Sequence, residues 1–133
     1  MEKFRAWDKA HEVMRNVLLI DFFSRSIICE TDDERNIKLY DTTYELLQST
    51  GLEDKDGVEI FEGDILKGLM DFGPAGYVES VAPVSYHKIN GYQLHYFLLE
   101  HTEVIGNVYE DKNIKFGTME EWWIVIADGL LKW

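Results

Sequence analysis

Apolar and polar residues alternate in short runs along most of the chain, and this pattern predicts a mainly β protein with minor α content. After residue 51 come the runs "VEIF", "ILKGLM", "YVESVAPVSY", "YQLHYFLL" and "EVIGNVYE", separated by turn-forming residues about every ten positions. Asp56 and Gly57 are typical of a tight hairpin, whose central residues adopt positive φ. Pro74 lies between two glycines and marks a loop, since proline cannot occupy a central strand. We expect a small sandwich or barrel.

The two ends of the chain are harder to interpret. Near the start, Trp7, Ala10, Met14 and Val17 recur at helical spacing, yet "KFRAWD" alone alternates as a strand does. The end of the chain, "EEWWIVIADGLLKW", carries large apolar side chains that must be buried on their own domain or on a neighbouring subunit. We expect a single domain over residues 1–133, with an N-terminal extension (1–45), a core (46–116) and an aromatic tail (117–133). The predicted contact surface is formed by Trp122, Trp123 and Trp133.

Charge narrows the choice of partners. The chain has 25 acidic and 13 basic side chains, a formal net charge of −12. Affinity for nucleic acid depends on Lys and Arg that displace counterions from phosphates, so we expect no direct binding to nucleic acid or to anionic membranes. An acidic surface can instead imitate a polyanion and occupy a basic site on another protein, and this alternative stays open.

Other features of the composition bear on compartment and chemistry. No run approaches the roughly 18 apolar residues of a membrane span, and the start lacks a secretory core, so we expect a cytoplasmic protein. Cys29 is the only cysteine, which excludes an intrachain disulfide and zinc sites built from cysteine pairs. We interpret it as a buried thiol.

The stretch "LEDKDGVEIFEGDILK" (52–67) contains six acidic residues and two glycines, and it raises the question of a cation site. A calcium loop of the EF-hand type needs an acidic first ligand and a glutamate six residues after its glycine. With Gly57 in the glycine position, these ligands become Leu52 and Gly63. Asp and Gly favour tight reversals, so turn chemistry accounts for the same residues. We expect no metal ion and no cofactor.

No catalytic motif stands out. The chain lacks G-x-S-x-G, a P-loop and G-x-G-x-x-G, and its four histidines form neither H-x-H nor H-x-x-x-H. We therefore predict no catalytic residues and a protein that is not an enzyme. A small-molecule-binding domain or enzyme remains an alternative, which would need a deep pocket with convergent polar groups.

Three blocks of the chain together are similar to one known family. They are "KFRAWD" (3–8), "LLQSTGLEDKDGVEIFEGDIL" (46–66) and "EVIGNVYED" (103–111). In this order and spacing they resemble the YopX family of phage and prophage proteins, whose middle block is the most specific. The departures are "LQS" at 47–49, "EDKNI" at 110–114 and the tail after Phe116, which has no counterpart in the family's pattern.

The resemblance implies an SH3-like β-barrel at the centre of the chain, and it implies that "KFRAWD" is a strand. It implies no enzymatic activity, so no catalytic residue is carried over. The family's recurrent residues are structural: it implies that Trp7, Ile60 and Ile65 lie in the core and that Asp64 accepts backbone N–H bonds across its turn. The residues predicted at structural turns are Gly51, Asp56, Gly57, Gly63, Asp64 and Gly106.

These observations favour a phage- or prophage-encoded protein that acts through protein–protein contacts. The expected partner is a second copy of the chain, in a homo-oligomer, or a host or phage protein. The alternatives are an acidic nucleic-acid mimic that inhibits a host protein, and a small-molecule-binding domain or enzyme.

Overall fold

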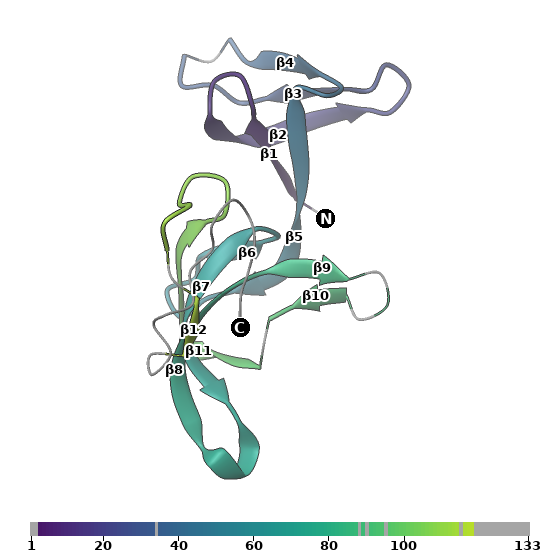
Figure 1. The fold of residues 1–133 in the computed structure, drawn as a ribbon. Coiled ribbons are helices and arrows are strands. Elements are labelled where there is room, and N and C mark those ends of the chain that lie inside the picture. Colours follow the sequence, from purple (N-terminus) through teal and green to yellow (C-terminus); the bar gives the residue numbers. More distant parts are fainter. Residues whose placement is uncertain are drawn as a thin grey trace. The chain divides into compact units, whose positions relative to one another are not determined.

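The computed structural model describes residues 3–33, 35–87, 89, 91–94, 96–114 and 116–118. Within these residues the regular elements are all β-strands apart from one short 3-10 turn (Figure 1). The mainly β prediction is confirmed. None of the described residues forms a helix long and apolar enough to cross a membrane.

The chain divides into two compact units, Met1–Ser49 and Thr50–Trp133. The division falls four residues after the predicted end of the N-terminal extension and lies inside one strand. The prediction of a single domain over residues 1–133 stays a prediction.

The first unit is a sheet of antiparallel strands in the order β4-β3-β2-β1-β5. Its strand β1 is the predicted "KFRAWD" segment, so the strand interpretation is right and the helical one is wrong. Strand β5 continues into the second unit, where β6 is its hydrogen-bonded neighbour. The bounds are β1 (Phe4–Asp8), β2 (Val13–Asp21), β3 (Ser26–Cys29), β4 (Ile37–Tyr40) and β5 (Tyr44–Glu53).

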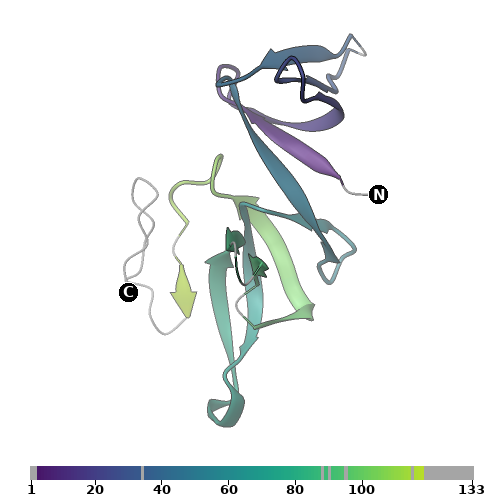
Figure 2. The ribbon, with the colours of Figure 1, turned by 90° about the vertical axis from the view of Figure 1, so that its right-hand side faces the viewer.

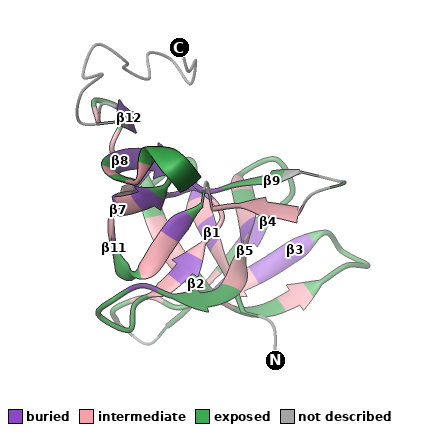
Figure 3. Ribbon diagram, turned by 90° about the horizontal axis from the view of Figure 1, so that it is seen from below, coloured by how far each residue is buried: buried purple, intermediate pink, exposed green. Residues whose placement is uncertain are grey.

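The core of the first unit lies on one face of this sheet. Ala6, Ile27, Cys29 and Leu39 are buried there, and most of β3 is coloured as buried in Figure 3. Burial raises the pKa of the Cys29 thiol, as expected for a plain buried cysteine. Trp7 is only half-buried, so its predicted core position is wrong. Side chains alternate along a strand, and the inward positions of β1 are taken by its small and charged residues.

The second unit contains a four-stranded antiparallel sheet in the order β11-β7-β8-β12 and a separate pair, β9 with β10. Strands β7 and β8 form a long hairpin closed by the 3-10 turn η1 (Gly73–Ala75), seen from two directions in Figures 1 and 2. The bounds are β6 (Glu59–Phe61), β7 (Asp64–Asp71), β8 (Tyr77–Pro83), β9 (Ser85–His87), β10 (Gly91–Gln93), β11 (Phe97–Asn107) and β12 (Gly117–Thr118).

The core of this unit has two clusters, and the predicted core residues Ile60 and Ile65 are both fully buried. Ile60 packs in the larger cluster and Ile65 in the smaller, beside Phe116. The larger cluster consists of Ile60, Leu66, Met70, Ala82, Val84 and Phe97.

The strands form open sheets, so the prediction of a closed barrel is wrong. Within the described residues, β11 and β12 are the two edges of the four-stranded sheet and each pairs with a different strand, β7 and β8. The finer SH3-type arrangement stays a prediction.

Candidate functional site

Three of the six residues predicted at turns lie at turns, and a fourth, Asp64, is the first residue of β7. Asp56 and Gly57 form the loop between β5 and β6, with Gly57 at φ 78°, and Gly63 joins β6 to β7 at φ 88°. Asp64 follows immediately, and its Oδ2 accepts the Phe61 N–H at 2.8 Å across the turn. The predicted role of Asp64 is confirmed.

The other two glycines lie inside strands. Gly51 is in β5 and adopts φ 79°, a conformation that favours glycine, in the part of the strand beyond its pairing with β1. Gly106 is in β11 beside a register shift. A Cβ at Gly106 would collide with the Asp111 carboxylate, whose Oδ2 accepts the Asn107 N–H at 3.1 Å. Gly51 is therefore needed for its positive φ and Gly106 for the close approach of Asp111, and neither lies at a turn.

Asp54 lies in the acidic stretch 52–67, which we call the acidic centre, and its side chain binds the backbone of neighbouring segments. This role was not predicted from the sequence. The Asp54 side chain is almost fully buried and accepts three backbone N–H bonds: Oδ1 from Asp56 at 2.8 Å and Val58 at 2.9 Å, and Oδ2 from Val104 at 2.9 Å. Burial alone would raise the pKa of this carboxyl, but the hydrogen bonds outweigh burial and lower it. The Asp54 carboxylate therefore binds amide groups and fastens the β5–β6 hairpin to β11.

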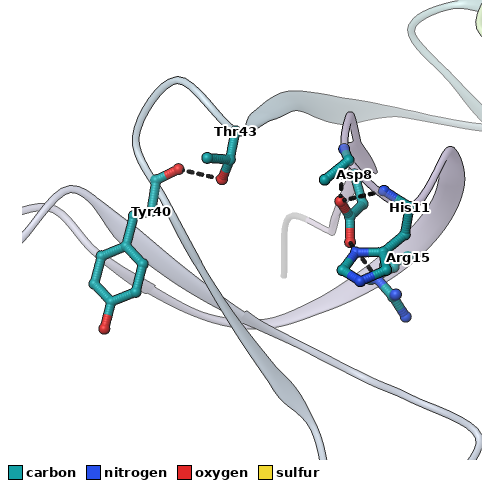
Figure 4. Close-up of polar contacts among 6 residues, drawn as sticks. Asp8, His11, Arg15, Tyr40 and Thr43 are labelled. Atoms are coloured by element: carbon teal, nitrogen blue, oxygen red, sulfur yellow. Dashed lines mark hydrogen bonds and ion pairs between the residues drawn. The ribbon is translucent and has the colours of Figure 1, made fainter.

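A second buried carboxylate lies in the first unit. Asp8 is fully buried, and its Oδ2 accepts the Arg15 Nε–H at 3.0 Å and lies 2.8 Å from His11 Nδ1 (Figure 4). Its Oδ1 accepts the N–H groups of Ala10 and His11, each at 3.2 Å. Burial would raise the pKa of Asp8, but these bonds hold it below its usual value. The arrangement closes the turn between β1 and β2, whose residue Glu12 has φ 54°.

Two neighbouring aromatic side chains at the turn between β2 and β3 are highly exposed. Phe22 and Phe23 are 83% and 98% exposed. The turn is ordered by Asp21, whose Oδ1 accepts the N–H groups of Phe23 at 3.0 Å and Ser24 at 3.2 Å, and by Arg25 at φ 54°. We call residues 21–25 the phenylalanine tip. Two rings held in water by an ordered turn are an apolar contact point rather than part of the core.

The second unit has a shallow, open surface pocket of about 350 Å³. Its lining is polar and contains both signs of charge, with Lys67 and Glu79 forming a weak ion pair at 3.9 Å. Gly68 lines the pocket and lies close to the backbone of His101 and Thr102. The lining residues are Lys55, Lys67, Gly68, Leu69, Glu79, His101 and Glu103. Among the residues that the structure describes, no group of three acidic, histidine or cysteine side chains is placed to hold a metal ion.

The predicted contact surface of Trp122, Trp123 and Trp133 lies outside the described residues, so it stays a prediction. The phenylalanine tip was not predicted. Its sequence signal was "IDFFS", in which Asp21 precedes two aromatics and a serine, as in a turn closed by a short acidic side chain.

This arrangement defines a small, mainly β protein in which Asp54 accepts backbone hydrogen bonds and two exposed phenylalanines lie at a hairpin tip. Residues 3–114 match the family model described as "YopX protein", and the chain belongs to the YopX family. It is similar to the crystal structure of protein EF1440 from Enterococcus faecalis, with 28% sequence identity and a TM-score of 0.55. The similarity covers 84% of this chain and 95% of that chain. No curated protein matches the chain.

Proposed function

We propose that this chain is a non-enzymatic, phage- or prophage-encoded protein that acts in the bacterial cytoplasm through protein–protein contacts, with the phenylalanine tip as its contact point. The observation that carries the proposal is the exposure of Phe22 and Phe23, 83% and 98%, on a turn fastened by Asp21. Aromatic anchors are enriched among the residues that dominate binding energy at interfaces.

The order of the turn supports this role. Binding costs conformational entropy when loops and side chains must be fixed, and a group that is already held loses less. Burying both rings removes on the order of 350 Å² of apolar surface from water, because each aromatic side chain offers about 150–250 Å². At about 25 cal/mol per Å² this corresponds to a gross gain of roughly 9 kcal/mol, from which the costs of association are subtracted.

Site-specific photo-crosslinking tests the proposal. A benzophenone amino acid replaces Phe23 in one preparation and Tyr77 in another, and each is irradiated in bacterial cells that produce the protein. Tyr77 is a matched control because it is an aromatic residue of the second unit that is 64% exposed. We expect a discrete protein adduct from position 23 and none from position 77. An absence of protein adducts at position 23 would contradict the proposal.

A further inference from the structure

Beside the phenylalanine tip, the outer face of the first unit's sheet carries further exposed apolar side chains, together with Lys38. The register places Leu19 opposite Ile28 and Ile28 opposite Lys38, and Tyr40 lies on the same face in the neighbouring row, opposite Ser26; Leu19, Ile28 and Tyr40 are here called the strip. Leu19 is 53% exposed and Tyr40 is 57% exposed. This is the face opposite the core formed by Ile27 and its neighbours. Together the tip and the strip form one surface, which we call the outer patch.

The outer patch is as large as the largest apolar patches that monomers expose, which are often functional. The two rings of the tip contribute about 350 Å² and the half-exposed Leu19 and Tyr40 bring the total to roughly 500 Å². Contiguous apolar patches beyond a few hundred Å² mark interaction sites. Two such patches face to face bury about 1,000 Å² in total, which is the lower bound for a specific protein interface.

The charges around the outer patch are balanced. Asp21 and Asp41 carry two negative charges, and Arg25 and Lys38 carry two positive ones; Arg25 Nη1 lies 3.8 Å from Asp41 Oδ2. Residues 50–133 contain 15 acidic and 6 basic side chains, a net charge of −9, whereas residues 1–49 contain 10 and 7, a net charge of −3. A two-fold contact sets a surface against its own copy, so it requires a patch that does not repel itself. The four charges around the outer patch sum to zero, so two patches do not repel each other, although the whole chain carries a net charge of −12.

We propose that the partner at this surface is a second copy of the chain, joined by a two-fold contact between outer patches. This inference rests on the proposed function and specifies its partner. The two tips supply the apolar centre, and Lys38 and Tyr40, whose ammonium and ring lie 5.3 Å apart, border it. Because the gain in buried area is modest, the dimer forms in a concentration-dependent way and dissociates on dilution.

Sedimentation equilibrium of the full chain between about 1 μM and 1 mM tests the inference. The wild type is expected to rise from its monomer mass of 15.6 kDa toward twice that value. The double variant Phe22→Ser/Phe23→Ser is expected to associate at least ten-fold more weakly. Phe72→Ser/Tyr77→Ser removes exposed aromatics from the second unit and is expected to behave as the wild type.

The outer face provides a second route to the same contact. Leu19→Glu/Tyr40→Glu leaves the tip intact, adds two negative charges to each of the two facing patches, and is expected to abolish association. Circular dichroism confirms that each variant keeps its β signal.

Three results would overturn the inference: a strictly monomeric wild type, unchanged association in both first-unit variants, or loss of association only in Trp122→Ser/Trp123→Ser. If the tip crosslinks to a different protein while the chain sediments as a monomer, the proposed function stands and the second copy is refuted as its partner.

Discussion

Replacing Asp54 by asparagine tests the interpretation of the acidic centre as hydrogen-bonded architecture. Asparagine has nearly the same shape but only one acceptor oxygen, whereas the Asp54 carboxylate accepts three N–H groups through two oxygens. If the asparagine oxygen replaces Oδ1, the bonds from Asp56 and Val58 are kept and the amide NH₂ faces the Val104 N–H. If it replaces Oδ2, only the bond from Val104 is kept and the NH₂ faces the other two N–H groups. A hydrogen bond to a charged group contributes about 1.5–3 kcal/mol, and an unpaired buried donor costs about 1–3 kcal/mol. We expect Asp54→Asn to lower the free energy of unfolding by about 2–4 kcal/mol at pH 7, out of a typical total of about 5–15 kcal/mol.

Asp56→Asn is the matched control, because it removes the same charge two residues away from an exposed position in the same turn. It is expected to change the free energy of unfolding by less than about 0.5 kcal/mol. Urea denaturation followed by circular dichroism measures both variants. Amide hydrogen exchange adds a local readout, since only Asp54→Asn is expected to lower the protection of Val104 N–H.

The pH dependence adds a further check on Asp54. Its pKa is lower in the folded protein than in the unfolded chain, so its stabilisation is present above the unfolded-state value and is lost as the pH falls through the folded-state value. The gap between wild type and Asp54→Asn is therefore expected to narrow toward acid pH. Equal stability of the two asparagine variants, or a gap that widens in acid, would refute the reasoning.

Two further substitutions test the packing of each unit. Asp8→Asn removes the charged partner of the largely buried Arg15 and is expected to lower the free energy of unfolding by about 3–5 kcal/mol near neutral pH. The loss is expected to shrink as the pH falls, and thermal denaturation at several pH values measures it. A loss of stability that stays constant with pH would contradict the role of the Asp8 charge. Gly68→Ala places a Cβ 2.6 Å from the Thr102 Cα and the His101 carbonyl oxygen, and is expected to cost about 1–3 kcal/mol by urea denaturation. An unchanged urea midpoint for Gly68→Ala would show that β11 can move away from β7.

Local chemistry accounts for the parts of the fold that the sequence predicted. Turn residues are chosen by the backbone conformation of a few neighbouring positions, so the loop at Asp56–Gly57 and the turn at Gly63–Asp64 could be recognised without knowledge of the rest of the chain. Ile60 and Ile65 followed from the resemblance to the family, and both are fully buried.

The features that were missed depend on distant partners or on irregular strands. Asp54 contacts Val104, which lies 50 residues further along, so its role as a fastener could not be read from its own neighbours. In β2 the register shifts between Val17 and Leu19, and a one-residue shift reverses which side chains face the core. The run "YQLHYFLL" was expected to be one strand, but β10 ends at Gln93 and β11 begins after Tyr96, which adopts φ 64°.

Edge protection explains why a contact through side chains is favoured over strand pairing in the first unit. Strand β4 is an edge of its sheet and has only four residues. The Tyr40 carbonyl accepts both the backbone N–H and the hydroxyl of Thr43, as Figure 4 shows for the hydroxyl. A short edge strand with an occupied carbonyl is a poor template for another strand. The exposed side chains of the outer patch therefore offer the better contact.

Amide chemical shifts of the ¹⁵N-labelled protein, followed over a dilution series, test the outer patch most directly. We expect concentration-dependent shifts at Leu19, at residues 21–25 and at Tyr40, with the amides around Phe72 and Tyr77 unchanged. Shifts centred on the second unit, or spectra that do not change with concentration, would contradict this expectation.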